Sequence, residues 1–359
     1  MVLDDVYRRL HQTGPEFRGW LSNHGPMAAE AMIRHGHGDG VQHWLDWYVR
    51  RLEPFPSGLA PIGADWREGL GDPRRIADWT RRLEREVAER PWPVVLNQWW
   101  PRLLPGITAG ATHGVIRVGH AVRVLLTDGD SPARVAELAH GLAYWAARWR
   151  PVSRPAALAE DGFENPDVAP FGTETLADGL AAIPRVAHPD GGFDSWLERI
   201  GDVPGWDDAL LAVSIPREPE SARDWLAHLV DVATIRYLWR GHGDAIMLVH
   251  SVTAPHAVWR ILPALDRRWW QPSALAAWIA VAALTAVYTP PTPADAELLP
   301  RVATGGEAAQ EAFARAADHA DEHVIKFADS ALDVYDRTHD PQALAAVYRA
   351  AALIRPVTG

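Results

Sequence analysis

The spacing of apolar residues is the feature of this sequence that most limits its possible folds. Along most of the chain, apolar side chains recur every three or four residues, and runs in which apolar and polar residues alternate are scarce. The first spacing places apolar side chains on one face of an α-helix, whereas alternation is typical of half-buried strands. The sequence therefore predicts an all-α protein. The expected helices cover residues 27–35, 41–52, 74–89, 112–126, 135–149, 221–240, 244–262, 273–287, 306–338 and 341–354.

The stretch from residue 151 to about residue 220 interrupts this pattern. It is rich in Pro, Gly and Asp, as in GFENPDVAPFG, and these residues favour turns and loops. Candidate site residues fall on both sides of it and would have to converge, which favours one domain over two domains joined by a linker. We therefore expect a single large helical domain over residues 1–359, with a long loop-rich excursion at 151–220. Loops of this length are often functional lids, and we expect that role here.

Charge and composition exclude several kinds of partner and site. The chain has 46 acidic and 35 basic residues and a net charge of -11, the wrong sign for a surface that neutralises phosphates, so no nucleic-acid partner is expected. The absence of cysteine excludes disulfides, thiolate nucleophiles and Cys-ligated metals. The N-terminus MVLDDVYRRLHQ lacks the pattern of a signal peptide, and the apolar stretch 273–288 is shorter than the ~20 residues of a membrane span. We expect a cytoplasmic protein without a membrane partner, in which this stretch is a buried helix.

The chain contains a single lysine, Lys326. All the remaining residues among its 35 basic residues are arginines. Lysine is normally among the commonest residues in soluble proteins. Arginine can replace it wherever only a positive charge is needed, but only lysine can lose its proton on burial and act as a nucleophile. Lys326 is therefore either a group with a chemical role or a chance survivor on a solvated helix face, and composition alone favours neither.

The 16 histidines are the candidate metal ligands of a chain without cysteine. His113, His250 and His323 lie among apolar residues of expected helices, where a single histidine is more often a hydrogen-bonded core residue than a ligand. His24 lies at the start of a helix, with its side chain free to point inward. His113 and His120 share a helix face, but seven residues separate them by ~10.5 Å along the axis, so only one of them can bind a given ion.

The expected helix 306–338 carries the most specific grouping. His319, His323, Lys326 and Ser330 fall on one stripe of that helix, because each is three or four residues from the next. One helix face would then present two imidazoles together with the only lysine of the chain.

Four short motifs contain most of these residues. They are Asn23-His24, His113-Gly-Val-Ile followed by Gly119-His120, His250-Ser-Val-Thr253, and His323-Val-Ile-Lys326. In kind and in order they resemble the motifs of the questin oxidase-like family, from about residue 20 to about residue 340. That family includes fungal oxygenases that open anthraquinone rings of aromatic polyketides. The resemblance implies a mainly helical fold and, as in at least one member, a non-haem iron held by four histidines and an N-carboxylated lysine.

Matched motif by motif, the resemblance implies that His24, His113, His250 and His323 bind Fe(II) and that carboxylated Lys326 completes the ligand set. It implies a catalytic role for Lys326 and for His120, which stands where relatives often have a tyrosine, either beside the ligands or facing the substrate. Pro26 and Met27 stand where relatives often have further histidines. The alternatives in which His120, His256 or His319 replaces one ligand therefore stay open.

The implied reaction uses O2 and a small aromatic substrate, and it is either oxidative ring cleavage or a Baeyer–Villiger-type oxygen insertion. Two other functions remain as alternatives. One is a hydrolase with a His-rich divalent-metal site, although the chain contains no HExxH motif. The other is a helical binding protein without catalysis. The 18 tryptophans suit either a packed core or, for some of them, a flat pocket for a polycyclic ligand.

Overall fold

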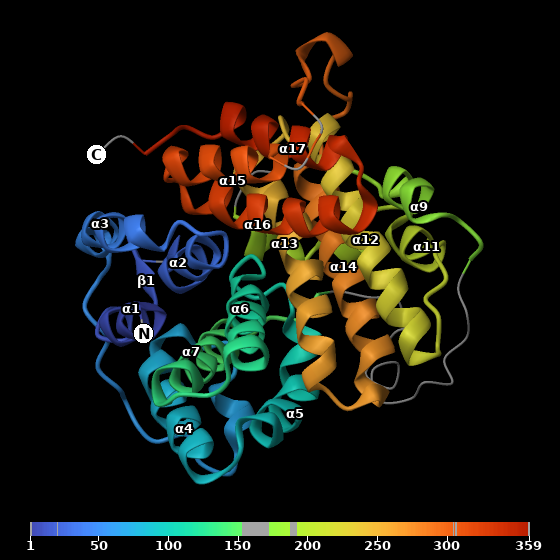
Figure 1. Cartoon of the computed structure of the whole chain (residues 1–359). Helices are drawn as coiled ribbons and strands as arrows, with labels where there is room; N and C mark the ends of the chain where they lie inside the picture. The colour runs from blue at the N-terminus through green and yellow to red at the C-terminus, as the bar shows by residue number, and fades with distance from the viewer. Residues whose placement is uncertain are drawn as a thin grey trace.

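The structure is a computed structural model that describes residues 2–19, 21–152, 172–186, 192–303, 305 and 307–357. Within these residues the regular structure is helical apart from two short antiparallel strands, β1 (Glu16–Phe17) and β2 (Leu21–Ser22) (Figure 1). The predicted all-α fold is confirmed. The α-helices are α1 (Val2–Leu10), α2 (Gly25–Arg34), α3 (Gly38–Tyr48), α4 (Ile76–Glu89), α5 (Trp92–Leu103), α6 (His113–Asp128), α7 (Pro132–Arg148), α9 (Leu176–Ala182), α10 (Phe193–Leu197), α11 (Trp206–Leu211), α12 (Pro219–Arg240), α13 (Ala245–Ile261), α14 (Trp270–Tyr288), α15 (Ala308–His319), α16 (Glu322–Thr338) and α17 (Pro341–Leu353). The short 3-10 helices are η1 (Val49–Arg51), η2 (Trp66–Gly69), η3 (Pro73–Arg75), η4 (Leu104–Gly106), η6 (Ile200–Asp202), η7 (Leu262–Ala264), η8 (Arg267–Trp269) and η9 (Ala296–Leu298).

Two large clusters of buried apolar side chains organise most of these helices. The first cluster fills the space between α4, α5, α6, α7, α14 and the C-terminal half of α13. The second lies between α1, α2, α3, α15, α16, α17 and the N-terminal half of α13. In Figure 1, α15, α16 and α17 form the upper layer, α4 and α5 lie at the bottom, and α6 and α13 lie between them. Because α13 contributes to both clusters, its middle is placed where the two cores meet.

The loop-rich stretch is partly helical where the structure describes it. Residues 153–171 and 187–191 lie outside the described residues, so the lid expected there stays a prediction. The short helices α9, α10 and α11 pack against α12 and α14 and bury Leu180, Trp206 and Leu210 at 0%, 0% and 1% exposure. Side chains buried to this degree belong to the core, so these helices form part of its wall. The prediction of a single domain for the whole chain stays a prediction.

The helix expected over residues 306–338 is in fact two helices. α15 ends at His319, Ala320 takes a left-handed conformation with φ 63°, and the side chain of Asp321 caps α16 by accepting a hydrogen bond from the His323 backbone N–H (2.8 Å). The prediction of one continuous face that carries both His319 and His323 was wrong. The apolar spacing continues across the break, whereas the left-handed residue and the new cap change the direction of the chain.

The two most apolar helices are core helices. α13 continued by η7 (Ala245–Ala264) and η8 continued by α14 (Arg267–Tyr288) are long and apolar enough to cross a membrane, but 78% and 94% of their apolar windows are buried inside the protein. The buried helix predicted for residues 273–288 is therefore confirmed. It begins earlier than expected, at Trp270, because Pro272 sits in the first turn, where its missing N–H costs no hydrogen bond.

Tryptophans make up much of the first core. Trp99 and Trp100 are both fully buried, and each meets another tryptophan edge to face, Trp99 with Trp79 (ring centroids 5.4 Å apart) and Trp100 with Trp145 (5.4 Å). Such pairs stabilise a core by dispersion and by the favourable edge-to-face arrangement of the rings. The Trp99-Trp100 pair is thus packed in the interior and does not line a ligand pocket.

Gly119 sets how closely α6 approaches α13. A Cβ added at Gly119 would lie 2.5 Å from the Cβ and 2.8 Å from the Cα of Ala257, atoms that cannot move without the helix. Gly119→Ala should therefore push the two helices apart and lower the free energy of unfolding by about 1–3 kcal/mol. Gly63→Ala is the matched control, because no atom lies within 4 Å of its added Cβ. Urea unfolding of the two variants measures the difference, and equal stabilities would contradict the close approach.

Candidate metal centre

Four histidine side chains converge where the two cores meet. His24 caps α2, His113 begins α6, His250 lies in the middle of α13, and His323 lies in the first turn of α16. One ring nitrogen of each lies within 4.8 Å of those of the other three, and the Nε2 atoms of His24 and His250 are 2.7 and 3.0 Å from Nε2 of His113. All four side chains are buried. The structure thus brings together the four histidines that were chosen from the sequence motifs.

Three of these histidines stand at helix N-termini. The positive ends of α2, α6 and α16 therefore face the cluster, an arrangement that disfavours protonated imidazole and favours a negative charge. Sequence reasoning placed helix starts at His24 and His113 but missed the start at His323. The available signal was Asp321, an N-cap residue type immediately before the first turn.

Hydrogen bonds on the far side of the rings fix which nitrogens face the cluster. Nδ1 of His113 lies 2.5 Å from the Gly110 carbonyl oxygen, and Nδ1 of His323 lies 3.2 Å from Oδ1 of Asp321. Carbonyl and carboxylate oxygens only accept, so each of these Nδ1 atoms holds the proton and each Nε2 offers a lone pair. The Gly110 carbonyl is placed by a run of left-handed residues, Gly110 (φ 53°), Ala111 (φ 53°) and Thr112 (φ 70°).

Burial keeps three of the four imidazoles uncharged. It lowers the pKa of His24, His113 and His250 well below that of a free imidazole, and the neighbouring charge of Lys326 lowers it further. Neutral imidazole is the form that binds metal ions. At neutral pH the site therefore presents lone pairs.

Lys326 lies one turn after His323 on α16 and is fully buried, at 0% exposure. Its Nζ has no hydrogen-bond partner among the described residues. Burial lowers the pKa of its amine to about 7, although the charges of Glu322 and Asp321 act in the opposite direction. The alternative of a lysine on a solvated helix face is therefore wrong. An unpaired polar atom in the interior costs free energy, which points to a missing partner at this position.

The donor set fits a divalent transition metal. Two nitrogens bound at ~2.1 Å and 90° apart on one ion would be separated by ~3.0 Å, and the Nε2 atoms of His113 and His250 are 3.0 Å apart. Imidazole nitrogens suit Fe(II) as well as Zn(II) and Cu(II). The residues present therefore fit iron.

A buried carboxylate next to His24 escaped the sequence reasoning. Oε1 of Glu322 lies 3.9 Å from Nδ1 of His24 and pairs with Arg51, whose guanidinium stacks over the ring of Tyr48 at 4.2 Å. The Tyr48 hydroxyl accepts a hydrogen bond from the backbone N–H of His24 (2.6 Å). These contacts hold His24 in place from the side opposite its Nε2. The sequence analysis did not select Arg51 or Glu322, because neither residue belongs to one of the four motifs.

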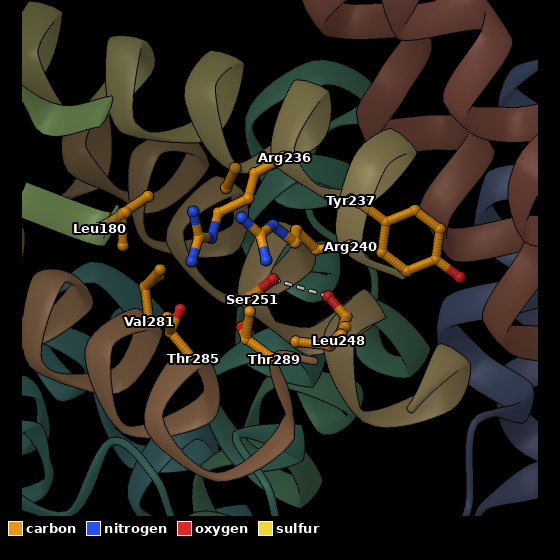
Figure 2. A pocket seen from close by; sticks show the side chains of 10 residues that line it. Leu180, Arg236, Tyr237, Arg240, Leu248, Ser251, Val281, Thr285 and Thr289 are labelled. Carbon is orange, nitrogen blue, oxygen red and sulfur yellow. Dashed lines mark hydrogen bonds between the residues drawn. The ribbon is translucent and has the colours of Figure 1, made fainter. Parts of the chain in front are cut away.

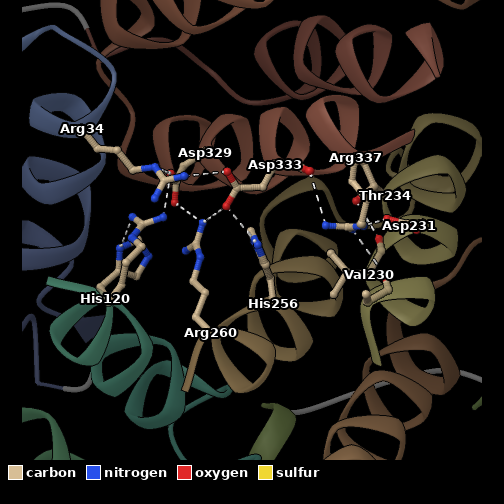
Figure 3. Close-up of polar contacts among 12 residues, drawn as sticks. Arg34, His120, Val230, Asp231, Thr234, His256, Arg260, Asp329, Asp333 and Arg337 are labelled. Carbon is tan, nitrogen blue, oxygen red and sulfur yellow. Dashed lines mark hydrogen bonds and ion pairs between the residues drawn. The ribbon is translucent and has the colours of Figure 1, made fainter. Parts of the chain in front are cut away.

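His120 lies in a different, charged cluster about two helical turns along α6 from His113. Its Nδ1 is 2.7 Å from Oε2 of Glu30, Arg123 donates to both Glu30 and Asp329, and Arg260 donates to Asp329 (2.7 Å). Figure 3 shows His120, Arg260 and Asp329 pointing toward one another from α6, α13 and α16. These helices and α2, which carries Glu30, also carry or adjoin the four clustered histidines. We call the group of Glu30, His120, Arg123, Arg260 and Asp329 the charged layer. It lies on the same helices as the four clustered histidines.

The charged layer is not a second metal site. Glu30, His120 and Asp329 have the spacing of one, but Arg123 and Arg260 already neutralise the two carboxylates. Burial alone would raise the pKa of Glu30, yet Arg123 and His120 outweigh it and lower the pKa to about 2. His120 is thus bound to Glu30 and does not belong to the group of four histidines. Its expected catalytic role stays a prediction.

The other two alternative ligands also lie outside the cluster. Nε2 of His256 is 3.2 Å from Oδ2 of Asp333, and Nε2 of His319 is 3.1 Å from the Ile354 carbonyl oxygen. His319 is displaced because it ends α15 and does not belong to the helix of His323. Neither histidine takes the place of one of the four.

A family model described as Questin oxidase-like matches residues 48–330, which is most of the chain. No curated protein matches the chain. The matched range contains His113, His250, His323 and Lys326, whereas His24 precedes it and is tied to the group by its 2.7 Å contact with His113. The family's description indicates an oxidoreductase that acts on a small aromatic molecule. By its sequence motifs, its helical fold and this match, the chain belongs to the questin oxidase-like family.

Proposed function

We propose that this protein is a non-haem iron-dependent oxygenase that acts on an aromatic polyketide or a related quinone. The observation that carries the proposal is the convergence of four buried histidines beside a fully buried lysine whose amine has no hydrogen-bond partner among the described residues. Iron would be held by His24, His113, His250 and His323. Fe(II) bound there would supply the activation of O2 for ring cleavage or for Baeyer–Villiger-type oxygen insertion.

The amine of Lys326 would carry a carboxyl group. Its neutral form adds to CO2, the new N–C bond gives a carbamate, and one proton is released to a base such as the nearby Glu322. The carbamate places one negative charge in a site that three helix N-termini face. It would also give the buried end of this side chain the partner that it lacks.

The surrounding residues prepare the site for this chemistry. Gly110 and Asp321 hold the rings of His113 and His323 with their lone pairs inward, and Tyr48 holds the backbone of His24. The apolar side chains of both cores exclude bulk water from the imidazoles, and this strengthens every electrostatic interaction within the site. Ion pairs of Arg123 with Glu30 and Asp329, and of Arg260 with Asp329, join the helices that carry or adjoin the four histidines.

Removal of a single ligand should remove the metal. We expect His113→Ala and His323→Ala to lower iron content at least tenfold, because each leaves an incomplete set of donors. His24→Ala and His250→Ala should cause slightly smaller losses of iron for the same reason. Elemental analysis of protein purified without an affinity tag measures the iron content. His319→Asn is the matched control, since His319 lies outside the group of four histidines and its Nε2 donates to the Ile354 carbonyl oxygen (3.1 Å), and it should keep its iron. Full iron occupancy in the His113 and His323 variants would contradict the assignment.

The reaction itself is tested by oxygen uptake. Iron-loaded protein should consume O2 when it is mixed with members of a panel of anthraquinones and their hydroquinones, and the His113→Ala variant should not. Chromatography of the same mixtures identifies ring-opened or lactone products. Hydrolysis of ester substrates without O2 uptake would instead support the divalent-metal hydrolase.

A further inference from the structure

A cavity of about 710 Å³, open to solvent, lies between α2, α3, α15 and the C-terminal segment. We call it the α3 cavity, and its walls include Met32, Trp44, Trp47, Ala317 and Val357. Pockets that bind drug-sized ligands typically have volumes of about 300–1,000 Å³. By contrast, the crevice between α9, α12, α13 and α14 in Figure 2 holds only about 10 Å³, room for about one water molecule. The α3 cavity therefore has room for an organic molecule of two or three rings.

Two tryptophans of α3 line this cavity. The ring of Trp44 stacks on Tyr48 (centroids 4.6 Å apart, planes at 20°), and its Nε1 donates to the Ala320 carbonyl oxygen (2.9 Å). The guanidinium carbon of Arg51 lies over the ring of Trp47, 4.9 Å from its centroid. Both indoles are thus held by contacts within the protein and also border the cavity. An aromatic surface that is already fixed can stack on a flat aromatic ligand with little loss of side-chain freedom.

The charges around the cavity disfavour an anionic ligand. Three carboxylates line it, those of Asp39, Asp46 and Asp318, whereas Arg50 is the one arginine among the lining residues. Of the three carboxylates, only Asp46 has an ion-pair partner among the described residues, Arg9 at 2.6 Å. Charges of the same sign repel, so a ligand with a negative group would be bound less well than its uncharged counterpart.

The walls of the α3 cavity continue into residues that support two of the clustered histidines. Tyr48, on which one of the two indoles stacks, accepts a hydrogen bond from the backbone N–H of His24 (2.6 Å). Ala320 in the cavity wall is followed directly by Asp321, whose Oδ1 lies 3.2 Å from Nδ1 of His323. The cavity therefore adjoins the supports of the candidate metal centre, although none of the four clustered histidines lines it.

We propose that the α3 cavity binds a flat aromatic molecule without negative charge, stacked against Trp44 and Trp47. The size of the cavity, the two fixed indoles and the surrounding carboxylates together select this class of ligand. An aromatic substrate belongs to the same class, and the cavity would hold it next to the metal centre. That last assignment rests on the proposed function, whereas the class of ligand rests on the cavity alone.

Calorimetric titration of the metal-free full chain at pH 8 tests this site. The probes are 2-naphthalenemethanol, which is flat and uncharged, sodium naphthalene-2-sulfonate, which is flat and anionic, and 1-adamantanemethanol, which is uncharged but not flat. We expect saturable binding of 2-naphthalenemethanol and at least tenfold weaker binding of the other two probes.

Two glycines of α3 provide a matched pair of variants. Gly40 lines the cavity, and a Cβ added there would meet only Cε of Met32, at an ordinary 3.9 Å, so Gly40→Leu should fill the cavity without strain. Gly38 does not line the cavity, and its added Cβ would lie 3.8 Å from Cγ1 of Ile33. We expect Gly40→Leu to weaken binding of 2-naphthalenemethanol at least tenfold and Gly38→Leu to bind it as wild type does. Trp47→Leu should weaken it about tenfold, because it removes one stacking surface.

The absence of saturable binding of 2-naphthalenemethanol by the wild-type protein would overturn the site. Unchanged binding in both Gly40→Leu and Trp47→Leu would overturn it as well. Tighter binding of the sulfonate or of the adamantane probe would overturn the class of ligand. Because the titration needs no iron, a failure of the oxygen-uptake experiment would contradict the proposed function and not this site.

Discussion

Replacement of Lys326 by arginine should abolish both iron binding and oxygen uptake, although it keeps the positive charge. Arginine cannot form a carbamate and cannot lose its proton, so it would place a permanent cation beside the four buried imidazoles. The position is fully buried, and Nζ has no hydrogen-bond partner there among the described residues. Elemental analysis and an oxygen electrode measure the two losses. Retained iron and activity in Lys326→Arg would refute a chemical role for this lysine.

Lys326→Met distinguishes a loss of iron binding from a failure to fold, because methionine keeps the apolar part of the side chain and removes only the amine. It should lose iron but stay folded. In the metal-free, CO2-free protein it should also be more stable than wild type, because the unfolded chain holds the lysine proton up to about pH 10.5 whereas the folded chain releases it near pH 7. At about 1.4 kcal/mol per pKa unit, the advantage of Lys326→Met should be roughly 5 kcal/mol at and below pH 7. It should shrink as the pH rises toward 10.5, and urea unfolding across this range measures it.

The carbamate has its own test. Lys326→Ala leaves a cavity next to the four histidines, and formate or acetate entering it should restore part of the iron binding and activity. In the wild-type protein, a carbamate carbon should be visible by NMR after exchange with labelled CO2. An unmodified amine in active, iron-loaded protein would refute the modification while leaving the histidine assignment intact.

Removal of the Asp329 carboxylate should cause the largest loss of stability among single changes in the charged layer. Asp329 is fully buried and accepts hydrogen bonds from Arg123 (3.0 Å), Arg260 (2.7 Å) and His35 (3.0 Å). Asp329→Ala would leave two buried guanidinium groups short of negative charge. Breaking a buried pair in this way costs about 3–5 kcal/mol.

Asp5→Ala is the matched control for that experiment. Asp5 pairs with Arg8 at the surface, where both side chains are more than half exposed, so its loss should change stability by about 1 kcal/mol at most. Urea unfolding compares the two variants. Because Asp329 and His323 lie on the same helix, Asp329→Ala should also lower iron content. Equal stability of the two variants would contradict the view that the charged layer holds the helices together.

Local sequence patterns determined the helices and most of the candidate site. The repeat of three and four residues depends only on the geometry of a single helix, so helices such as α6, α12 and α13 were predicted to within a few residues. The presence of a single lysine singled out Lys326 from composition alone, whereas His113, His250 and His323 were selected through the resemblance of their motifs to those of the questin oxidase-like family.

Tertiary structure alone decided how these helices meet. The histidines of α2, α6, α13 and α16 converge because two apolar cores fix the positions of those helices, and residues far apart in the sequence supply the contacts. The break after His319 was missed because a left-handed residue interrupts a helix without disturbing its apolar period. The pairing of His120 with Glu30, and of Arg123 and Arg260 with Asp329, was not predicted either, because each pair joins residues of different helices. Whether a buried ionisable group becomes a ligand or one half of an ion pair depends on the charge that folding brings to it, and no local pattern carries that information.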